Sequence, residues 1–124
     1  MKNITGETEI IIGIVFGSSE TSATFYDFKC GDKIDLDILP GLKVVQSAVA
    51  IFEQDSKETI SIGDIAILSA PIAKEIQIGF RKRPSEMNLS ERNRMVAFMH
   101  GVYIEILHRH PDFATRPHVV YMAG

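Results

Sequence analysis

Apolar positions in the first half of the chain follow strand-like patterns. Residues 9–16, with the sequence EIIIGIVF, are apolar at nearly every position, which predicts a strand buried on both faces. Residues 21–28 are rich in β-branched and aromatic side chains and predict a second strand, antiparallel to the first across the turn GSSE. Residues 42–52 and 59–63 predict two further strands, separated by the polar turn EQDSKE. Residues 29–41 are typical of an irregular loop.

The pattern changes to a helical period in the second half. Residues 88–110 predict a long amphipathic helix, with apolar side chains at helical spacing at Met95, Phe98, Met99, Val102 and Ile106. Asn88 followed by Glu91 resembles a capping box, Ser90 is a rival cap, and Pro111 ends the helix. The apolar run 118–122 then predicts a return strand.

Two shorter elements are predicted between the strands and the long helix. Asp64 is a candidate N-cap for a short helix that ends before Pro71. Ile76, Ile78 and Phe80 alternate with polar residues or glycine, which favours a short strand. The complete order of strands, helix and strand predicts an α+β fold.

Composition and charge narrow the class of protein. The chain has 124 residues, 45% of them hydrophobic, which fits one globular domain. A net charge of −3 argues against a general nucleic-acid binder, which would carry a basic face. Cys30 is the only cysteine, so no internal disulfide can form, as is typical of a reducing cytoplasm. The polar N-terminus is unlike a signal peptide, and no apolar run has the length of a membrane helix. We therefore expect a cytoplasmic protein that binds neither nucleic acid nor membrane.

The turn after the first strand carries the strongest candidate chemistry. Gly17 permits a close approach, and Ser18, Ser19 and Thr21 offer hydroxyl donors beside backbone N–H groups, a set that can surround phosphate oxygens. Glycine and serine are also standard turn residues, so an ordinary hairpin is the alternative. The turn is not a Walker motif, because no GxxxxGK[ST] sequence is present.

Other candidate groups carry weaker signals. The basic run Arg81–Arg83 could reach a phosphate, and the alternative is a solvated basic loop. The run His108–His110 fills the last helical turn, where positive charge suits the helix dipole. The histidine spacing differs from the i, i+4 pair of helical metal sites, so we predict no metal site. Cys30 lies in no catalytic motif and no GxSxG sequence occurs, so a triad hydrolase has no support.

Four segments in order resemble a known family. IGIVFGSSETSATF is similar to the phosphate motif IGIDxGTTNSxVAV, and VVQSAVAIFEQDSKETISIGDIA is similar to TPSVVAFxxxGERLVGxxA. NLSERNRMVAFMHGVYIEIL lies where the family has an LTPEE-type helix start and a long helix, and RPHVVYMAG lies where a strand like AVITVPA follows. The family is that of the seventy-kilodalton heat-shock chaperones, in the actin and sugar-kinase superfamily. The resemblance spans residues 9–124 and implies part of a ribonuclease-H-like, actin-like ATPase lobe.

The resemblance assigns roles to individual residues. Gly17, Ser18 and Ser19 lie at the Gly-Thr-Thr positions, and Glu20 replaces the asparagine that follows, so the four are expected to bind nucleotide. Lys82 is the nearest match to the catalytic lysine, and a shift of one residue would place Arg81 there instead. Val15 replaces the aspartate that organises magnesium, which argues against magnesium binding because a valine cannot hold a metal-bound water. Gln46 replaces a family proline, with no clear consequence.

The resemblance implies a function for the parent protein. We expect residues 1–124 to be a single partial domain, the N-terminal lobe of an actin-like ATPase domain cut from a longer protein, with residues 1–8 disordered. Such a chain would be the ATP- or ADP-binding segment of a heat-shock-type chaperone, with weak nucleotide affinity and no turnover alone. Client proteins or co-chaperones would then be partners. The alternative is a non-enzymatic interaction module that forms homo-oligomers through an exposed sheet edge.

Overall fold

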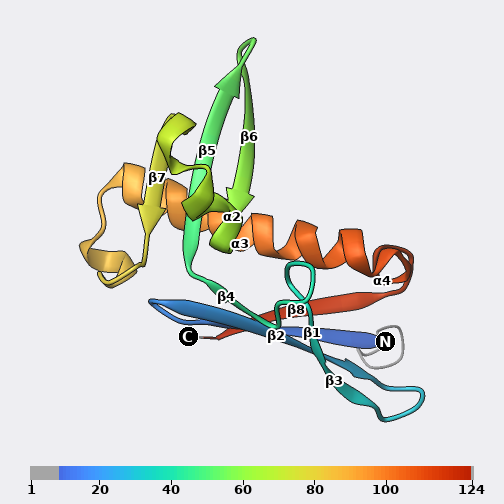
Figure 1. Ribbon diagram of the computed structural model, residues 1–124. Helices are drawn as coiled ribbons and strands as arrows, with labels where there is room; N and C mark the ends of the chain where they lie inside the picture. Colours follow the sequence, from blue (N-terminus) through green and yellow to red (C-terminus); the bar gives the residue numbers. More distant parts are fainter. Residues whose placement is uncertain (1–8, 124) are drawn as a thin grey trace.

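The computed structural model describes residues 9–123, which form two sheets, one long helix and two short α-helices (Figure 1). The disorder expected for residues 1–8 lies outside this range. The first sheet holds β1 (Ile10–Phe16), β2 (Glu20–Asp27), β3 (Lys33–Leu36), β4 (Val44–Gln46) and β8 (His118–Ala123). The second sheet holds β5 (Ala48–Gln54), β6 (Lys57–Ile62) and β7 (Glu75–Ile78). The helices are α2 (Gly63–Leu68), α3 (Leu89–Arg109) and α4 (Pro111–Thr115), and two 3-10 turns span Ala70–Ile72 and Pro84–Glu86.

The first sheet has the order β3-β2-β1-β8, with β4 paired to β2. The predicted hairpin is confirmed, because β1 and β2 pair antiparallel and Phe16 faces Thr21 next to the turn. The predicted return strand is also confirmed, and β8 pairs parallel to β1. β3 lies inside the segment predicted to be a loop, so that prediction is wrong for residues 33–36. These residues do alternate between polar and apolar, but the glycine, aspartate and proline residues of the segment favoured a loop.

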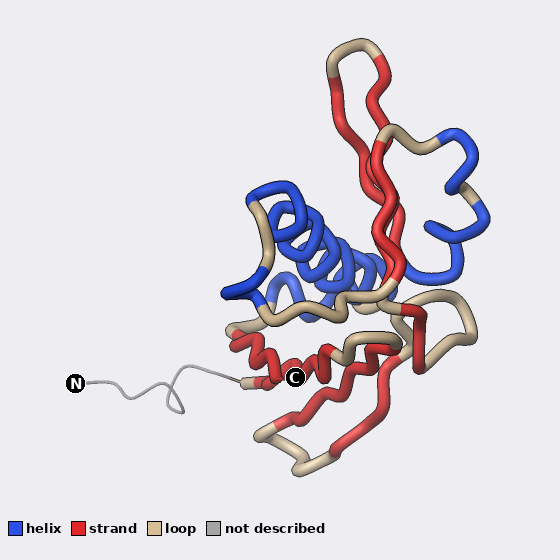
Figure 2. Tube along the Cα trace, turned by 90° about the vertical axis from the view of Figure 1, so that its left-hand side faces the viewer, coloured by secondary structure: helices blue, strands red, loops and turns tan. Residues whose placement is uncertain are grey.

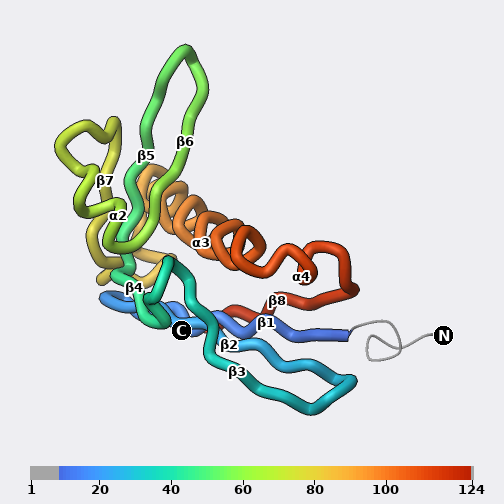
Figure 3. Tube along the Cα trace, turned by 45° about the vertical axis from the view of Figure 1, so that its right-hand side comes forward, coloured from blue at the N-terminus to red at the C-terminus, as the bar shows by residue number. Residues whose placement is uncertain are grey.

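The prediction that β1 is buried on both faces is wrong. Ile10, Ile12 and Ile14 face the core and are at most 3% exposed, whereas Val15 on the other face is 56% exposed. α3 covers the core face, and β8 returns beneath it (Figure 3). Among the described residues no helix covers the opposite face of this sheet, which is why a strand that is apolar throughout is buried on one side.

The predicted strand at 42–52 is in fact two strands in different sheets. β4 pairs with β2 in the first sheet, while β5 pairs with both β6 and β7 in the second sheet. The chain passes from one sheet to the other at Ser47. The β5–β6 hairpin then projects away from the first sheet (Figure 2). The strand predicted from Ile76, Ile78 and Phe80 is confirmed as β7, and Phe80 follows it as a buried side chain.

The long helix begins as predicted. The Asn88 side chain accepts a hydrogen bond from Glu91 N at 2.9 Å, and Glu91 Oε1 accepts one from Asn88 N at 3.2 Å, so Asn88 and not Ser90 is the cap. The residues of α3 that are buried in the core, together with residues of both sheets, are Met95, Phe98, Val102 and Ile106. Pro111 ends α3 and is also the first residue of α4, where a missing N–H costs no helical hydrogen bond.

The predicted cap of the short helix is wrong. α2 begins at Gly63, after Ile62, and has no side-chain cap. Asp64 instead lies in the first turn, and its Oδ1 accepts a hydrogen bond from Gln46 N at 3.3 Å. The carboxylate therefore joins α2 to the end of β4 and does not cap its own helix.

Ion pairs of Arg116 hold the start of β8 against the β1–β2 hairpin. Arg116 Nε lies 3.0 Å from Glu9 Oε1, and Arg116 Nη2 lies 3.0 Å from Asp27 Oδ2. The pKa of Asp27 is lowered first by the hydrogen bond from Lys29 N and then by Arg116. The pKa of Glu9 is lowered by the Lys29 side chain and then by Arg116. Both carboxylates are thus held in the charged form.

We expect this cluster to make the chain less stable in acid. The pKa values of Glu9 and Asp27 are lower in the folded chain than in the unfolded chain. The cluster therefore stabilises the fold fully at any pH above the pKa values of the unfolded chain. This stabilisation is lost as the pH falls below about 4 and through the folded values. Arg116→Gln should therefore be less stable than the natural chain at pH 7, with a difference that shrinks toward pH 3. Urea unfolding of both chains between pH 3 and 7 measures this, and a difference independent of pH would contradict it.

Candidate functional site

The turn that joins β1 to β2 is closed by a hydrogen bond from Gly17 N to Glu20 O at 3.0 Å. A Cβ atom on residue 17 would lie 2.4 Å from Glu20 O, closer than any real contact, so only glycine fits this position. Ser18, Ser19 and Glu20 are exposed. The local sequence therefore builds a tight turn with polar side chains at its tip.

The carbonyl groups of the turn are bonded to the second sheet and its flanks. Ser18 O accepts a hydrogen bond from Phe80 N, and Ser19 O accepts one from Ser47 N, both at 2.8 Å. Within residues 9–123, the N–H groups of Ser18 and Ser19 donate no backbone hydrogen bond. The turn thus has neighbouring N–H and hydroxyl donors free for an anion.

A cavity of about 330 Å³ lies beside this turn. Ser18 and Lys82 are its polar lining residues, and the rest of the lining is mainly aromatic and sulfur-containing, from Phe16, Phe80, Met95, Met99 and Met122. The cavity lies where the parallel strands β1 and β8 both end. In open parallel α/β sheets ligands bind outside the carboxyl ends of the strands, and β1 and β8 are the parallel pair of this otherwise antiparallel sheet.

Lys82 is held by an ion pair at the edge of the cavity. Its Nζ lies 3.1 Å from Glu91 Oε1, the same oxygen that accepts the hydrogen bond from Asn88 N. These contacts lower the pKa of Glu91, with the Asn88 N–H as the largest cause and Lys82 as the next. The lysine side chain is still 57% exposed, so an anion can reach it.

The structure brings some of the predicted site residues together. Ser18 and Lys82 line one cavity, Gly17 shapes the turn, and Ser19 and Glu20 are exposed at its tip outside the described cavity lining. Arg81, the alternative to Lys82, lines an adjacent cavity of about 150 Å³ that also includes Lys82. The catalytic role of Lys82 and the nucleotide contacts of the four turn residues stay predictions.

Val15 lies on the open face of the first sheet, paired with Ser22 of β2 and Ala123 of β8. Its side chain offers no oxygen to a cation. Residue 15 therefore supplies no negative charge to a magnesium ion.

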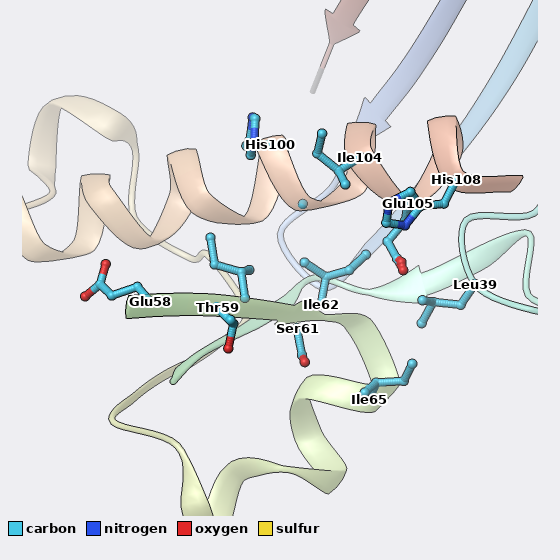
Figure 4. A pocket seen from close by; sticks show the side chains of 12 residues that line it. Leu39, Glu58, Thr59, Ser61, Ile62, Ile65, His100, Ile104, Glu105 and His108 are labelled. Atoms are coloured by element: carbon cyan, nitrogen blue, oxygen red, sulfur yellow. The ribbon is translucent and has the colours of Figure 1, made fainter. Parts of the chain in front are cut away.

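The histidines take other positions. His118 Nδ1 lies 2.8 Å from Arg116 O, so Nδ1 carries the proton in the neutral ring, and Tyr103 Oη donates to His118 Nε2 at 2.6 Å. His100 and His108 line a separate cavity of about 360 Å³ between α3 and β6 (Figure 4). Within residues 9–123, no group of three potential ligands could hold a metal ion.

Sequence reasoning missed Ser47, which is 1% exposed and bonded to the turn through both its side chain and its backbone. It also missed the methionines of the cavity, which were assigned to a helical core stripe or to a strand. No local signal marks either feature, because a serine between two apolar runs and a methionine on a helix are both common.

Comparison with known proteins supports the fold. No family model and no curated protein matches the chain. The fold is similar to a solved structure of the actin-like ATPase MamK, a non-polymerising mutant bound to AMPPNP, with a TM-score of 0.52 and 14% sequence identity. The match covers 94% of this chain and 32% of the MamK chain, so this chain spans about a third of the length of the structure it matches.

At this identity the likeness shows the fold alone. The expected mixed α+β fold is confirmed, and its arrangement is similar to part of the MamK fold. The narrower assignment to the seventy-kilodalton heat-shock chaperones receives no support from the comparison.

In the described part of the chain, no helix is both long enough and apolar enough to pass through a membrane.

Proposed function

We propose that this chain is a nucleotide-binding part of an actin-like ATPase, in which the Gly17–Glu20 turn and Lys82 hold the phosphate groups of ATP or ADP. The observation that carries this proposal is that Ser18 and Lys82 line one cavity beside a turn in which, among residues 9–123, the Ser18 and Ser19 N–H groups donate no backbone hydrogen bond. The similar fold of MamK, whose structure contains AMPPNP, adds support.

The chemistry of the turn suits phosphate oxygens. The N–H and hydroxyl groups of Ser18 and Ser19 would donate hydrogen bonds, and Lys82 would supply positive charge. Val15 leaves the metal side of the site without a carboxylate, so Lys82 is the principal source of positive charge in the proposed contacts. One lysine and one short turn give few contacts, and we expect a dissociation constant of about 1 mM or weaker for ATP and no hydrolysis by this chain.

Glu91→Gln should strengthen ATP binding by about two- to fivefold. The substitution removes the anion that competes with phosphate for Lys82, and glutamine still forms the capping box at this position. Titration of the isotope-labelled chain with ATP, followed by the amide signals of the turn, measures the affinity. Glu86→Gln is the matched control, because Glu86 accepts a hydrogen bond from Arg83 N and makes no described contact with Lys82.

The same titration tests the proposal itself. Signals of Gly17, Ser18 and Ser19 should move with ATP, and Lys82→Met should weaken the effect. Signal changes confined to other elements would overturn the proposed site. Binding with micromolar affinity, or phosphate release, would overturn the expected weak affinity and lack of hydrolysis.

Two finer proposals go with it. A heat-shock-type chaperone as the parent, with its clients and co-chaperones, rests on the four sequence motifs alone. Self-association is favoured by the exposed apolar side chains of Leu68 and Ile72, which are 82% and 81% exposed. Light scattering across concentrations tests self-association, and a monomer at all concentrations would exclude it.

A further inference from the structure

Ser47 stands at the point where the chain leaves the first sheet and enters the second. It follows β4 and precedes β5, and it is 1% exposed although its side chain is polar. A buried hydroxyl requires hydrogen-bond partners, and those of Ser47 lie in the β1–β2 hairpin.

The hydrogen bonds of the Ser47 side chain have a definite direction. Ser47 Oγ donates its single proton to Gly17 O at 2.6 Å. The contact of 2.8 Å between Thr21 Oγ1 and Ser47 Oγ must then have Thr21 as the donor. A chain of hydrogen bonds therefore runs from Thr21 through Ser47 to the carbonyl group of Gly17.

The backbone of Ser47 continues this contact. Ser47 N donates to Ser19 O, and Ser47 O accepts from Gly79 N, both at 2.8 Å. Phe80 N donates to Ser18 O at 2.8 Å. The consecutive carbonyl groups of Gly17, Ser18 and Ser19 are thus all bonded to Ser47 or to Phe80.

These bonds fix the direction of the N–H groups of the turn. In a planar trans peptide unit, the C=O of one residue and the N–H of the next point in opposite directions. Holding the carbonyl of Gly17 therefore orients the N–H of Ser18, and holding the carbonyl of Ser18 orients the N–H of Ser19. Ser47 Oγ sets the first of these orientations through a bond that only its side chain makes.

We propose that Ser47 is a positioning residue for the phosphate turn, and that through it the placement of the second sheet controls how well the turn binds phosphate. The proposal rests on the proposed function of the turn. In this proposal Ser47 does not contact the phosphate. It acts by orienting the donor groups of Ser18 and Ser19. Because Ser47 leads into β5 and is bonded to Gly79 after β7, any shift of the second sheet moves the acceptors of the turn as well.

Ser47→Ala is the direct test, with Thr21→Val as the matched control. Both remove one buried hydroxyl from the same chain of hydrogen bonds, but only Ser47→Ala deletes the bond to Gly17 O. Amide hydrogen exchange and amide chemical shifts of residues 17–20 are recorded for each full chain without ligand. Each chain is then titrated with inorganic tripolyphosphate.

We expect Ser47→Ala to change the shifts and increase the mobility of Ser18 and Ser19, and to weaken tripolyphosphate binding by about fivefold. The Thr21 hydroxyl, predicted as a phosphate donor, is 1% exposed and donates to Ser47 Oγ, so that prediction is wrong for Thr21. Thr21→Val should therefore retain the natural shifts at Ser18 and Ser19, and should bind tripolyphosphate within about twofold of the natural chain. Ser47→Thr, which keeps the donor, should restore the shifts and the binding.

The outcomes separate the two proposals. If the natural chain does not respond to tripolyphosphate but Ser47→Ala still loosens the turn, the proposed function is overturned and the positioning role is supported. If the turn signals of Ser47→Ala match those of the natural chain, or if Thr21→Val disturbs the turn equally, the positioning role of Ser47 is overturned.

Discussion

Phe98→Ala should lower the free energy of unfolding by about 3–5 kcal/mol, the largest loss that we expect from a single substitution in this chain. Phe98 is fully buried on α3, and its ring centroid lies 5.5 Å from that of Phe16 and 5.5 Å from that of Phe80. Removing the ring would leave a cavity between α3 and the side chains of Phe16 and Phe80, which both line the candidate site.

Urea unfolding measures this loss. Val96→Ala is the matched control, because Val96 lies on the same helix but is 64% exposed, and it should change the free energy of unfolding by less than about 0.5 kcal/mol. Since Phe16 precedes the turn and Phe80 N is bonded to Ser18 O, the signals of the turn should also broaden in Phe98→Ala. Equal effects of the two substitutions would show that Phe98 is not packed as described.

Gly17→Ala should destabilise the chain by about 1–3 kcal/mol and abolish phosphate binding by the turn. The new Cβ atom would lie 2.4 Å from the backbone oxygen of Glu20, so the turn must open and the hydrogen bond from Gly17 N must lengthen or break. A backbone atom in a closed turn cannot move aside as a flexible side chain can.

Gly13→Ala, in β1 before the turn, provides the comparison. Its Cβ atom would lie 3.2 Å from the Thr24 side-chain oxygen, which can shift by the small distance required. We expect little change in the free energy of unfolding and unaltered turn signals for this variant. A Gly17→Ala chain with natural stability and a natural amide spectrum would contradict the geometry of the turn.

The elements that sequence reasoning found are those specified by local patterns. The apolar run 9–16, the β-branched and aromatic run 21–28 and the turn residues between them predicted the β1–β2 hairpin. The helical period together with Asn88 and Glu91 predicted α3 and its cap. Such signals depend on neighbours within a few positions, so they can be seen without the fold. The turn as a candidate site was found for the same reason, and Lys82 was added through the family resemblance.

The features that were missed depend on distant contacts. The division of 42–52 into β4 and β5 follows from pairing with β2 on one side and with β6 and β7 on the other, which the apolar run itself does not reveal. Ser47 bonds to Thr21 and Gly17, which lie 26 and 30 positions away. The exposure of Val15 depends on which face of the sheet is covered, and strand periodicity carries no information about a covering element.

The pairing of β1 with β8 has a consequence for how the chain folds. Ile10 lies opposite His118, so this pairing joins segments at the two ends of the described chain. The β1–β2 and β5–β6 hairpins need only short loops and can form early, whereas a pairing of such high contact order is slow to form. The candidate cavity includes Phe16 from β1 and Met122 from β8, so it is complete only when this pairing has formed. Ligand protection against proteolysis would therefore report complete folding and not the early hairpins.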